Sequence, residues 1–392
     1  MTNAKFRILD ISKTEFGFLQ LGSRLKAVNE CKEFENAILL PAGYSDPLFS
    51  KIGTKVLHEN GFNEFRPSLS YLNNIIKSVS KKIKLFEPHI VHTHSSKGGL
   101  VGRIAARRAD VPFVIHQVHG FGYKRLSGVK RYILEQLEKK LAKKCDLMLF
   151  QNKEDMETVA RWNTKTRLLF ISNGIDFSEF EVREMFLTPK ECNIMEIAYV
   201  GRQDKNKNHM MAFKAIEQIG TKIDIKLHIF GNGPMANENK SYVAHSSILS
   251  DRVLFHGNID REKLSDAMRA IHLNVLCSKQ EGNPRTVMEA SYLGIPTIGT
   301  NVVGTRESLI DGINGYLVPY NDHEEMARKI LQFYEEPKLW ADMSYSCREY
   351  ARNNFDERKV IQKLLIIYKA IIEGKIDSLI SQTNRGLNSN WF

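Results

Sequence analysis

Short apolar segments alternate with amphipathic segments along the first half of the chain. Strands are predicted where Val, Ile, Leu and Phe cluster, at 6–11, 36–42, 89–94, 113–120 and 147–151. Helices are predicted between them, including 69–86 and 129–144. In 129–144 one buried face is expected to consist of Val129, Tyr132, Ile133, Leu137 and Leu141. Strands that alternate with helices predict βαβ units and a parallel sheet.

The same alternation begins again in the second half, with predicted strands at 194–202, 225–234, 252–257, 273–278 and 295–300. The candidate linker is Thr188-Pro189. We therefore predict an α/β protein with two Rossmann-like, doubly wound domains. Their expected bounds are 1–187 and 188–354, followed by a closing helix at 355–375, with a return to the N-terminal domain as one option, and a polar tail at 376–392. Such domains bind ligands outside the carboxyl ends of their strands.

Composition narrows the class of protein. A chain of 392 residues is too long for a single domain of ordinary size. Its content of 42% hydrophobic and 26% charged residues is typical of a folded globular protein. No apolar run is long enough to span a membrane and no signal peptide begins the chain, so we expect a cytoplasmic protein. Five scattered cysteines, none in CxxC spacing, favour neither disulfides nor a zinc site.

The net charge of +11 is concentrated in one segment. Between Lys97 and Cys145, 12 lysines and arginines stand against three acidic residues. Such an excess favours an anionic partner, namely a phosphorylated substrate, an anionic lipid surface or nucleic acid, and it is equally compatible with a solvated helix face. No nucleic-acid-binding motif accompanies the charge, so no nucleic-acid partner is expected.

The segment EGNPRTVMEASYLGIP combines features of an anion site and of a hydroxyl site. Pro284 suits the first turn of a helix, because its missing N–H would be unpaired there. The backbone amides around Gly282 and that first turn can receive an anion, helped by the helix dipole. Glu281 and Glu289 would repel a phosphate but can accept hydrogen bonds from hydroxyls. The combination fits a nucleotide-sugar, although the spacing alone also fits a capped amphipathic helix with surface glutamates.

This segment resembles the glutamate-x7-glutamate signature of the family 4 retaining glycosyltransferases. Four further segments are similar to motifs of that family, in the same order: ISNGIDFSEF (171–180), YVGRQDKNKN (199–208), FGNGP (230–234) and NVVGTRESLIDGINGYLVP (301–319). The likeness spans most of residues 89–375. It implies the GT-B fold, in which two Rossmann-like domains face each other across a cleft, and transfer of a sugar from a nucleotide-sugar.

The resemblance assigns roles to the donor residues. Arg202 and Lys207 would clamp the diphosphate, with Lys205 as an alternative to Lys207 because the loop register is open. The complete expected diphosphate site is Arg202, Lys207, Gly282, Asn283, Pro284 and Arg285. Pro284 replaces a common glycine of the family, and Arg285 is an unusual additional cation there.

Three further assignments follow from the resemblance. Glu289 would hold the ribose, and Glu281 would lie near the hydroxyls of the donor sugar. His119, within VHGFG (118–122), would lie beside the transferred sugar, so His119 and Glu281 are the expected catalytic residues. The family's paired glycines are absent from the first loop, where Gly17 and Gly22 are candidate replacements.

The expected chemistry is metal-independent. Breaking the anomeric C–O bond places negative charge on the departing phosphate, which cations and amides would stabilise. No Asp-x-Asp follows a predicted strand, so neither a divalent metal nor another cofactor is expected. Retention is expected through same-face attack without an enzyme nucleophile.

His92 and His94 share a strand face and suggest a metal site with His116 or His119. Because no suitably placed carboxylate or cysteine lies nearby in the sequence, a polar cluster bordering the cleft is preferred.

The segment FGYKRLSGVKRY mixes aromatic and basic residues, a composition that suits the headgroup region of an anionic membrane. The predicted acceptor and membrane patch is Phe121, Tyr123, Lys124, Arg125, Lys130 and Arg131. We expect this domain to dock on the inner face of the cytoplasmic membrane and to receive a glycan on a polyprenyl diphosphate. The predicted function is transfer of a hexose or N-acetylhexosamine, UDP-linked by analogy with the family, in the synthesis of a surface polysaccharide.

Three other interpretations stay open. A transferase of the same fold could act on a small soluble acceptor, in which case the basic segment is ordinary surface. A nucleotide-sugar 2-epimerase shares the architecture but would need further acid and base groups in the cleft. A non-catalytic binding protein is the third interpretation.

Overall fold

The computed structural model describes residues 5–13, 16–44, 47–63, 68–181 and 187–385, without the side chains of 16–20, 47–48 and 384–385. The chain forms two compact units. The first unit comprises residues 1–172 together with 359–392, and the second comprises 173–358. Within the described ranges, every helix is too short or too polar to cross a bilayer.

The first unit is built on a seven-stranded sheet in which all pairings are parallel. Its strands are β1 (Phe6–Ile11), β2 (Phe34–Pro41), β3 (Lys55–Glu59), β4 (Ile90–His94), β5 (Phe113–Val118), β6 (Leu147–Phe150) and β7 (Arg167–Phe170). The spatial order is β3-β2-β1-β4-β5-β6-β7. The chain moves outward from β1 in one direction and then returns to place β4 on the other side. The topological switch, where loops diverge and ligands bind, therefore lies between β1 and β4.

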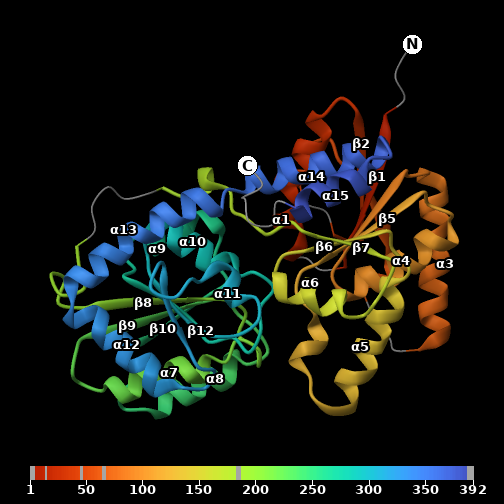
Figure 1. The fold of residues 1–392 in the computed structure, drawn as a ribbon. Coiled ribbons are helices and arrows are strands. Elements are labelled where there is room, and N and C mark those ends of the chain that lie inside the picture. Colours follow the sequence, from red (N-terminus) through yellow and green to blue (C-terminus); the bar gives the residue numbers. More distant parts are fainter. Residues whose placement is uncertain (1–4, 14–15, 45–46, 64–67, 182–186, 386–392) are drawn as a thin grey trace. The chain divides into compact units, whose positions relative to one another are not determined.

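Helices cover both faces of this sheet. One apolar cluster joins alternate strand residues to α3 (Leu69–Phe86) and α4 (Ser96–Arg108). Two others join the opposite residues to α1 (Phe16–Glu30), α2 (Pro47–Lys51), α14 (Glu357–Ile372) and α15 (Ile376–Arg385). Figure 1 shows α14 and α15 beside β1 and β2. The remaining elements of this unit are η1 (Asn60–Phe62), η2 (Gly122–Arg125), α5 (Gly128–Ala142) and α6 (Lys153–Ala160).

The second unit has a six-stranded parallel sheet in the order β10-β9-β8-β11-β12-β13. Its strands are β8 (Met195–Val200), β9 (Ile225–Phe230), β10 (Val253–Gly257), β11 (Leu273–Leu276), β12 (Thr297–Thr300) and β13 (Gly315–Val318). By the same reasoning as in the first unit, the topological switch lies between β8 and β11.

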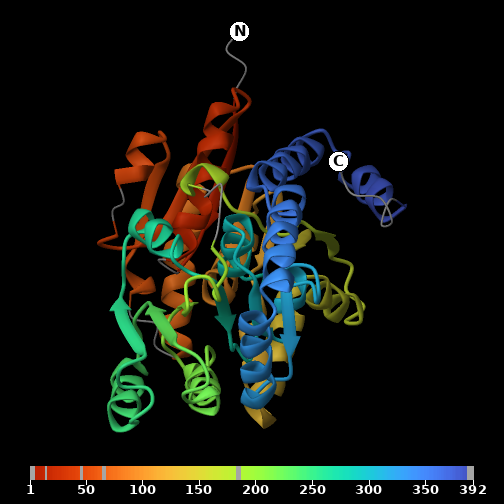
Figure 2. The same cartoon turned by 90° about the vertical axis from the view of Figure 1, so that its left-hand side faces the viewer.

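Two apolar clusters flank the second sheet. On one face lie α7 (His209–Ile219), α8 (Ala236–His245) and α12 (His323–Glu335), and on the other lie α9 (Arg261–Met268) and α10 (Arg285–Leu293). The helix α13 (Pro337–Asn354) contributes to both clusters, and η3 (Phe177–Glu179) and α11 (Thr305–Ser308) complete the unit. The layers can be followed in the perpendicular view of Figure 2.

The predicted strands agree with observed strands to within a few residues at their ends, and the α/β fold with two parallel sheets is confirmed. Three strands, β3, β7 and β13, were not predicted. Each has only four or five residues and lacks a long Val/Ile run. Such short segments become strands because they pair with a neighbouring strand. This pairing cannot be recognised from the local periodicity of the sequence.

The boundary between the units differs from the predicted one at 187/188. The second unit begins at Asn173, because the Ile175 amide donates to the Phe355 carbonyl and the Glu357 amide donates to the Ile175 carbonyl. These bonds attach the segment before the predicted linker to the end of α13. The closing helix predicted at 355–375 is confirmed as α14 (Glu357–Ile372), which begins three residues after α13 ends at Asn354. From Lys359 onward the chain belongs to the first unit.

The C-terminal segment is also more structured than its polarity predicted. Residues Ile376–Arg385 form α15, in which Ile376, Leu379 and Ile380 pack against the cluster that contains Leu364 and Tyr368. Apolar residues at this spacing give a short helix one buried stripe. The remainder of the predicted tail, 386–392, lies outside the described residues.

Candidate functional site

Loops that follow different strands meet at the carboxyl edge of the second sheet. Gly231, just after β9, has φ +121°, and a Cβ built on it would lie 2.2 Å from the carbonyl oxygen of Gly201, which follows β8. A Cβ on Gly233 would lie 2.4 Å from the carbonyl oxygen of Gln203. Only glycine allows the two loops to approach this closely. FGNGP therefore has a structural role, because it supports the loop that carries Arg202.

The loop after β11 is attached to the loop after β8. The Lys279 amide donates to the Asn206 carbonyl over 2.8 Å, and the Asn206 side-chain amide donates to the Gln280 carbonyl over 2.9 Å. The Glu281 amide donates to the carbonyl of Val303, which follows β12, over 3.0 Å. Together with the loop after β9, these contacts bring four strand-following loops together around the β8–β11 switch.

Lys207 and Glu281 form an ion pair at this edge. Lys207 Nζ donates to Glu281 Oε1 over 2.7 Å, and both side chains are largely buried. The Asp204 side chain accepts from the Lys207 amide over 3.1 Å, and the Tyr199 hydroxyl donates to the Lys207 carbonyl. Lys205, the alternative from the sequence, is exposed. The structure thus brings Lys207 rather than Lys205 to the predicted sugar-site glutamate.

Arg202 lies at the start of the loop after β8, and its side chain is exposed. In the described part of the chain, no carboxylate or carbonyl accepts a hydrogen bond from its guanidinium. It therefore differs from Lys207, whose charge is already compensated by Glu281. An uncompensated guanidinium is suited to meeting two oxygens of an anion at once.

Glu289 lies on α10 and is already engaged by arginines. Glu289 Oε1 accepts from Arg261 Nη2 over 2.9 Å and lies 3.8 Å from Arg285 Nε. Arg261 also pairs with Glu179 at 2.6 Å. A ribose bound by Glu289 would therefore share the carboxylate with Arg261. Sequence reasoning did not select Arg261, because an arginine in the first turn of a helix looks like an ordinary surface residue.

The remaining predicted diphosphate residues surround the start of α10. Pro284 is the N-cap, and the Asn283 carbonyl accepts from the Asn173 side chain over 3.1 Å. Gly282, Asn283 and Pro284 are all buried. Arg285 lies between Glu289 and Glu357, with Nη1 3.6 Å from the Glu357 carboxylate. Its charge is balanced within the unit, so it is less available to a phosphate than Arg202.

A pocket of about 480 Å³ opens beside Arg261, away from Lys207 and Glu281. It is lined by Ser178, Glu179, Phe180, Glu181, Arg261, Glu262, Ser265 and Asp266. Its acidic walls do not suit a diphosphate, and we do not assign the donor to it.

In the first unit, His119 follows β5 and contacts His94 at the end of β4, beside the switch between β1 and β4. Its Nε2 lies 3.2 Å from His94 Nδ1, and Gln151 also hydrogen-bonds the ring. Burial, followed by the nearby His94 and Arg24, lowers the pKa of His119 below its usual value. His119 is therefore neutral at physiological pH.

The residues proposed as a phosphate loop in the first unit are only partly described. Gly17 lies in the first turn of α1 rather than in a loop, and its surroundings lie outside the described residues; Gly22 lies further along the same helix. Lys13, after β1, is close to Lys97 in the first turn of α4. Burial and the charge of Lys97 lower the pKa of Lys13 to about 8.

Half of the predicted acceptor and membrane patch is not on the surface. Phe121 and Tyr123 are 3% and 4% exposed and belong to the apolar core, where Phe121 packs against Trp162. Lys124 Nζ donates to Asp155 Oδ1 over 2.5 Å and to Thr158. The prediction that these three residues face a membrane is wrong. Phe121 and Tyr123 close the core at the η2 turn, in which Gly122 and Arg125 are exposed.

A different surface is exposed on α5, which protrudes from its unit in Figure 1. The exposed fractions of Val129, Tyr132 and Ile133 are 74%, 64% and 58%, although helical periodicity predicted a buried face there. We call the N-terminal α5 surface the set of exposed residues Arg125, Leu126, Val129, Lys130, Arg131, Tyr132, Ile133 and Leu134. It combines cations with large apolar side chains, a composition that suits the headgroup region of an anionic membrane.

Two doubly wound parallel units, with cationic and acidic side chains at the carboxyl edge of one sheet and histidines at that of the other, define the class of α/β proteins that bind ligands outside the carboxyl ends of their strands. Models of two known domains match the chain: "Glycosyl transferases group 1" over residues 188–353 and "Glycosyl transferase 4-like domain" over residues 58–174. Together they cover well over half of the chain, which belongs to the family 4-type glycosyltransferases of the GT-B fold. The protein is a glycosyltransferase.

Three known proteins illustrate the similarity. The UDP-Gal:alpha-D-GlcNAc-diphosphoundecaprenol alpha-1,3-galactosyltransferase of Escherichia coli is 29% identical over 79% of this chain and 84% of its own length. The capsular polysaccharide biosynthesis glycosyltransferase CapM of Staphylococcus aureus is 28% identical over 76% of this chain and 83% of its own. The crystal structure of Anabaena Alr3699/HepE in complex with UDP has a TM-score of 0.75 at 18% identity, covering 94% of this chain and all of that one.

Proposed function

We propose that the protein transfers a hexose or N-acetylhexosamine from a UDP-sugar to a lipid-linked glycan during the synthesis of a surface polysaccharide. The relatives of known name support this acceptor class, since one acts on a diphosphoundecaprenol-linked sugar and another serves capsule synthesis. A UDP donor is supported by the UDP bound in the Anabaena structure.

The observation that carries the proposal is the arrangement at the β8–β11 switch. Arg202 offers an uncompensated guanidinium, while Lys207 offers an ammonium held in place by Glu281. A diphosphate at this edge would receive both cations and the amides at the start of α10. Glu281 would then accept hydrogen bonds from the donor sugar, and Glu289 from the ribose, beside Arg261.

The departing UDP gains negative charge as the anomeric C–O bond breaks, and preorganised cations stabilise that charge. Arg202 and Lys207 supply them at the diphosphate, so no divalent metal is required in this mechanism. His119 supplies a neutral imidazole to the transferred sugar. We propose retention of the anomeric configuration by same-face attack, in which the leaving phosphate accepts the acceptor's proton.

A panel of nucleotide-sugars tests the donor assignment. UDP-sugars are expected to raise the melting temperature of the protein, in EDTA as in MgCl2, in proportion to the logarithm of their concentration over Kd. Glu289→Ala removes a charged hydrogen-bond acceptor and is expected to weaken UDP binding by about tenfold or more. Glu262→Ala, which changes an exposed glutamate on α9, is the matched control. A full UDP-induced shift in Glu289→Ala would refute the ribose role.

Radiolabelled donors then separate the enzyme classes. Release of UDP together with labelled glycolipid in EDTA supports lipid-linked transfer. Label appearing in a small soluble product indicates a soluble acceptor. Inversion at C2 of the donor sugar, with no label transferred, would replace the proposal with epimerisation.

We further propose that the N-terminal α5 surface docks on an anionic membrane. In its favour, the exposed apolar residues Val129, Tyr132 and Ile133 alternate with Lys130 and Arg131 on the same two turns. Large apolar side chains enter the interface, while each nearby cation contributes about 1 kcal/mol of attraction to anionic lipid. An unpartnered apolar face on a protruding helix is otherwise unfavourable in water.

Co-sedimentation with vesicles of phosphatidylcholine containing phosphatidylglycerol measures this docking. Replacing Lys130 and Arg131 by glutamine is expected to weaken binding by about 30-fold, and Tyr132→Ser with Ile133→Ser by a similar factor. Leu69→Ser, at a similarly exposed apolar residue of α3, is the control and should bind as the wild type does. Equal vesicle binding by all variants would show that α5 is ordinary surface.

A further inference from the structure

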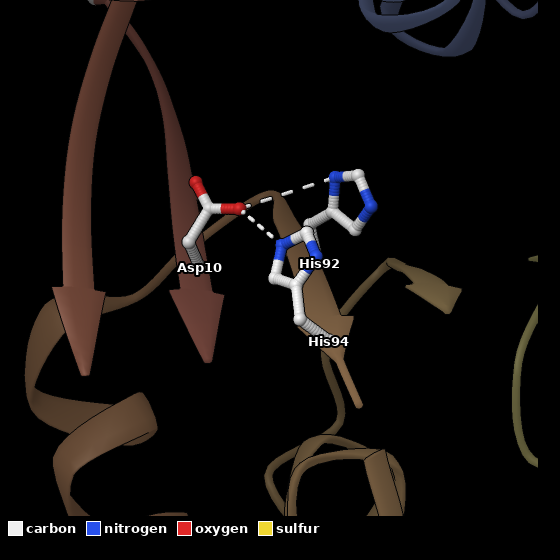
Figure 3. A group of neighbouring side chains, drawn as sticks. All are labelled: Asp10, His92 and His94. Atoms are coloured by element: carbon white, nitrogen blue, oxygen red, sulfur yellow. Dashed lines mark hydrogen bonds and ion pairs between the residues drawn. The ribbon is translucent and has the colours of Figure 1, made fainter. Parts of the chain in front are cut away.

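Buried polar side chains gather at the switch between β1 and β4. Figure 3 shows Asp10 on β1 pointing toward His92 and His94 on β4. All three are almost fully inaccessible to solvent. The Asp10 carboxylate lies 2.9 Å from His94 Nε2 and 4.0 Å from His92 Nδ1. Burying polar groups costs free energy unless they are hydrogen-bonded to one another, so a buried polar cluster is expected to have a structural or functional role.

The cluster has the residue types of a metal site, but its centre is already occupied by a cation. The Arg24 guanidinium donates to the same Asp10 oxygen and lies 3.2 Å from His94 Nε2. His92 Nδ1 is bonded to the Tyr368 hydroxyl at 2.8 Å. A metal ion at Asp10 and His94 would have to displace the arginine, whose charge already compensates the carboxylate. The cluster therefore acts through hydrogen bonds.

The hydrogen bonds determine where the ring protons lie. A carboxylate only accepts, so His94 carries its proton on Nε2 and donates to Asp10. The competing approach of Arg24 to the same nitrogen is longer, at 3.2 Å. Burial lowers the pKa of His94 to about 4, so the ring is neutral and its Nδ1 is an acceptor. His119 Nε2, 3.2 Å away, must then be the donor.

We propose that Asp10 and His94 are positioning residues that hold His119 in its neutral Nε2–H tautomer and in one ring orientation. The chain of bonds runs from the Asp10 oxygen through both nitrogens of His94 to His119. A neutral imidazole can remain beside the positive charge that develops on the transferred sugar, whereas an imidazolium would repel that charge. This consequence for transfer rests on the proposed function, while the tautomer itself does not.

Nuclear magnetic resonance of the full-length protein labelled with 15N-histidine tests the tautomer directly. In the wild type, the His119 signals, assigned by their loss in His119→Gln, are expected to show a protonated Nε2 and a bare Nδ1. In His94→Phe, which keeps a flat ring of similar size but removes both nitrogens, the protected Nε2–H proton is expected to disappear. A wild-type His119 that carries its proton on Nδ1 would overturn the proposal.

Kinetics test whether the position matters for transfer. His94→Phe is expected to lower kcat by about 10- to 100-fold, as for other bonds that orient a functional histidine, with the donor KM within about twofold. His94→Gln, whose side chain can both accept and donate hydrogen bonds, should have a kcat between those of His94→Phe and the wild type. Tyr368→Phe removes the His92 hydrogen bond but leaves the chain to His119, and is the matched control.

The kinetic results test the positioning role of the cluster separately from the proposed function. An unchanged kcat in His94→Phe, or an equal loss in Tyr368→Phe, would show that the cluster is only structural. Absence of sugar transfer by the wild type would refute the proposed function, while the 15N spectra would still decide the His119 tautomer.

Discussion

Lys207→Ala is expected to lower kcat for UDP-sugar turnover by about 10²- to 10³-fold, the usual effect of removing one group that stabilises developing charge. The substitution acts twice. It removes an ammonium from the proposed diphosphate site and leaves the Glu281 carboxylate, 2.7 Å from Lys207 Nζ, without its cation. An uncompensated carboxylate would repel the charge that grows on the departing UDP.

Lys205→Ala is the matched control, since it removes the same charge from the same loop at an exposed position. Its kcat should stay within about twofold of the wild type, because exposed charges are screened. Steady-state UDP release by both variants makes the comparison. Equal losses would mean that only the general charge of the loop matters, and the Lys207 assignment would fail.

Gly231→Ala is expected to destabilise the second unit by about 3 kcal/mol and to abolish most of the donor-induced thermal shift. The new Cβ would lie 2.2 Å from the Gly201 carbonyl oxygen, and φ is +121°. Overpacking of this kind costs about 1–3 kcal/mol, and a positive φ adds about 1–2 kcal/mol for a residue with a Cβ. Relief of the clash has to move Gly201, and Arg202 moves with it.

Gly257→Ala provides the control for backbone conformation alone. Gly257 also has positive φ, +67°, but a Cβ there meets nothing within 4 Å. The melting temperature of Gly257→Ala should fall by about 2–8 °C, against about 6–12 °C for Gly231→Ala. Gly257→Ala should keep the full shift with UDP. If Gly231→Ala also kept that shift at its lower melting temperature, the loop contact would not be needed to position Arg202.

The segments that were predicted well are those in which local chemistry and the tertiary environment agree. Strands such as β1 and helices such as α3 have the bounds that periodicity predicted, because their apolar residues are buried where the pattern placed them. The family motifs located Lys207, Glu281 and Glu289 near the same sheet edge, since every parallel strand ends at that edge.

Two errors have the same physical origin. The periodicity of α5 predicted a buried face, yet Val129 and Ile133 are exposed because, among the residues that the structure describes, no neighbouring element covers the first turns of that helix. Phe121 and Tyr123 look like membrane anchors in sequence, yet the turn after β5 directs both into the core. Periodicity describes which side chains share a face; it does not reveal whether another element covers that face.

The amino-acid sequence by itself determined the class of fold and the family, and it supplied most of the residues proposed to bind the donor, because these depend on local periodicity and on short motifs. Only the tertiary structure decided the pairing of Lys207 with Glu281, the engagement of Glu289 by Arg261 and the chain of hydrogen bonds from Asp10 to His119. Those contacts join residues that are far apart in the chain, and burial and hydrogen-bond geometry exist only after the sheets have formed.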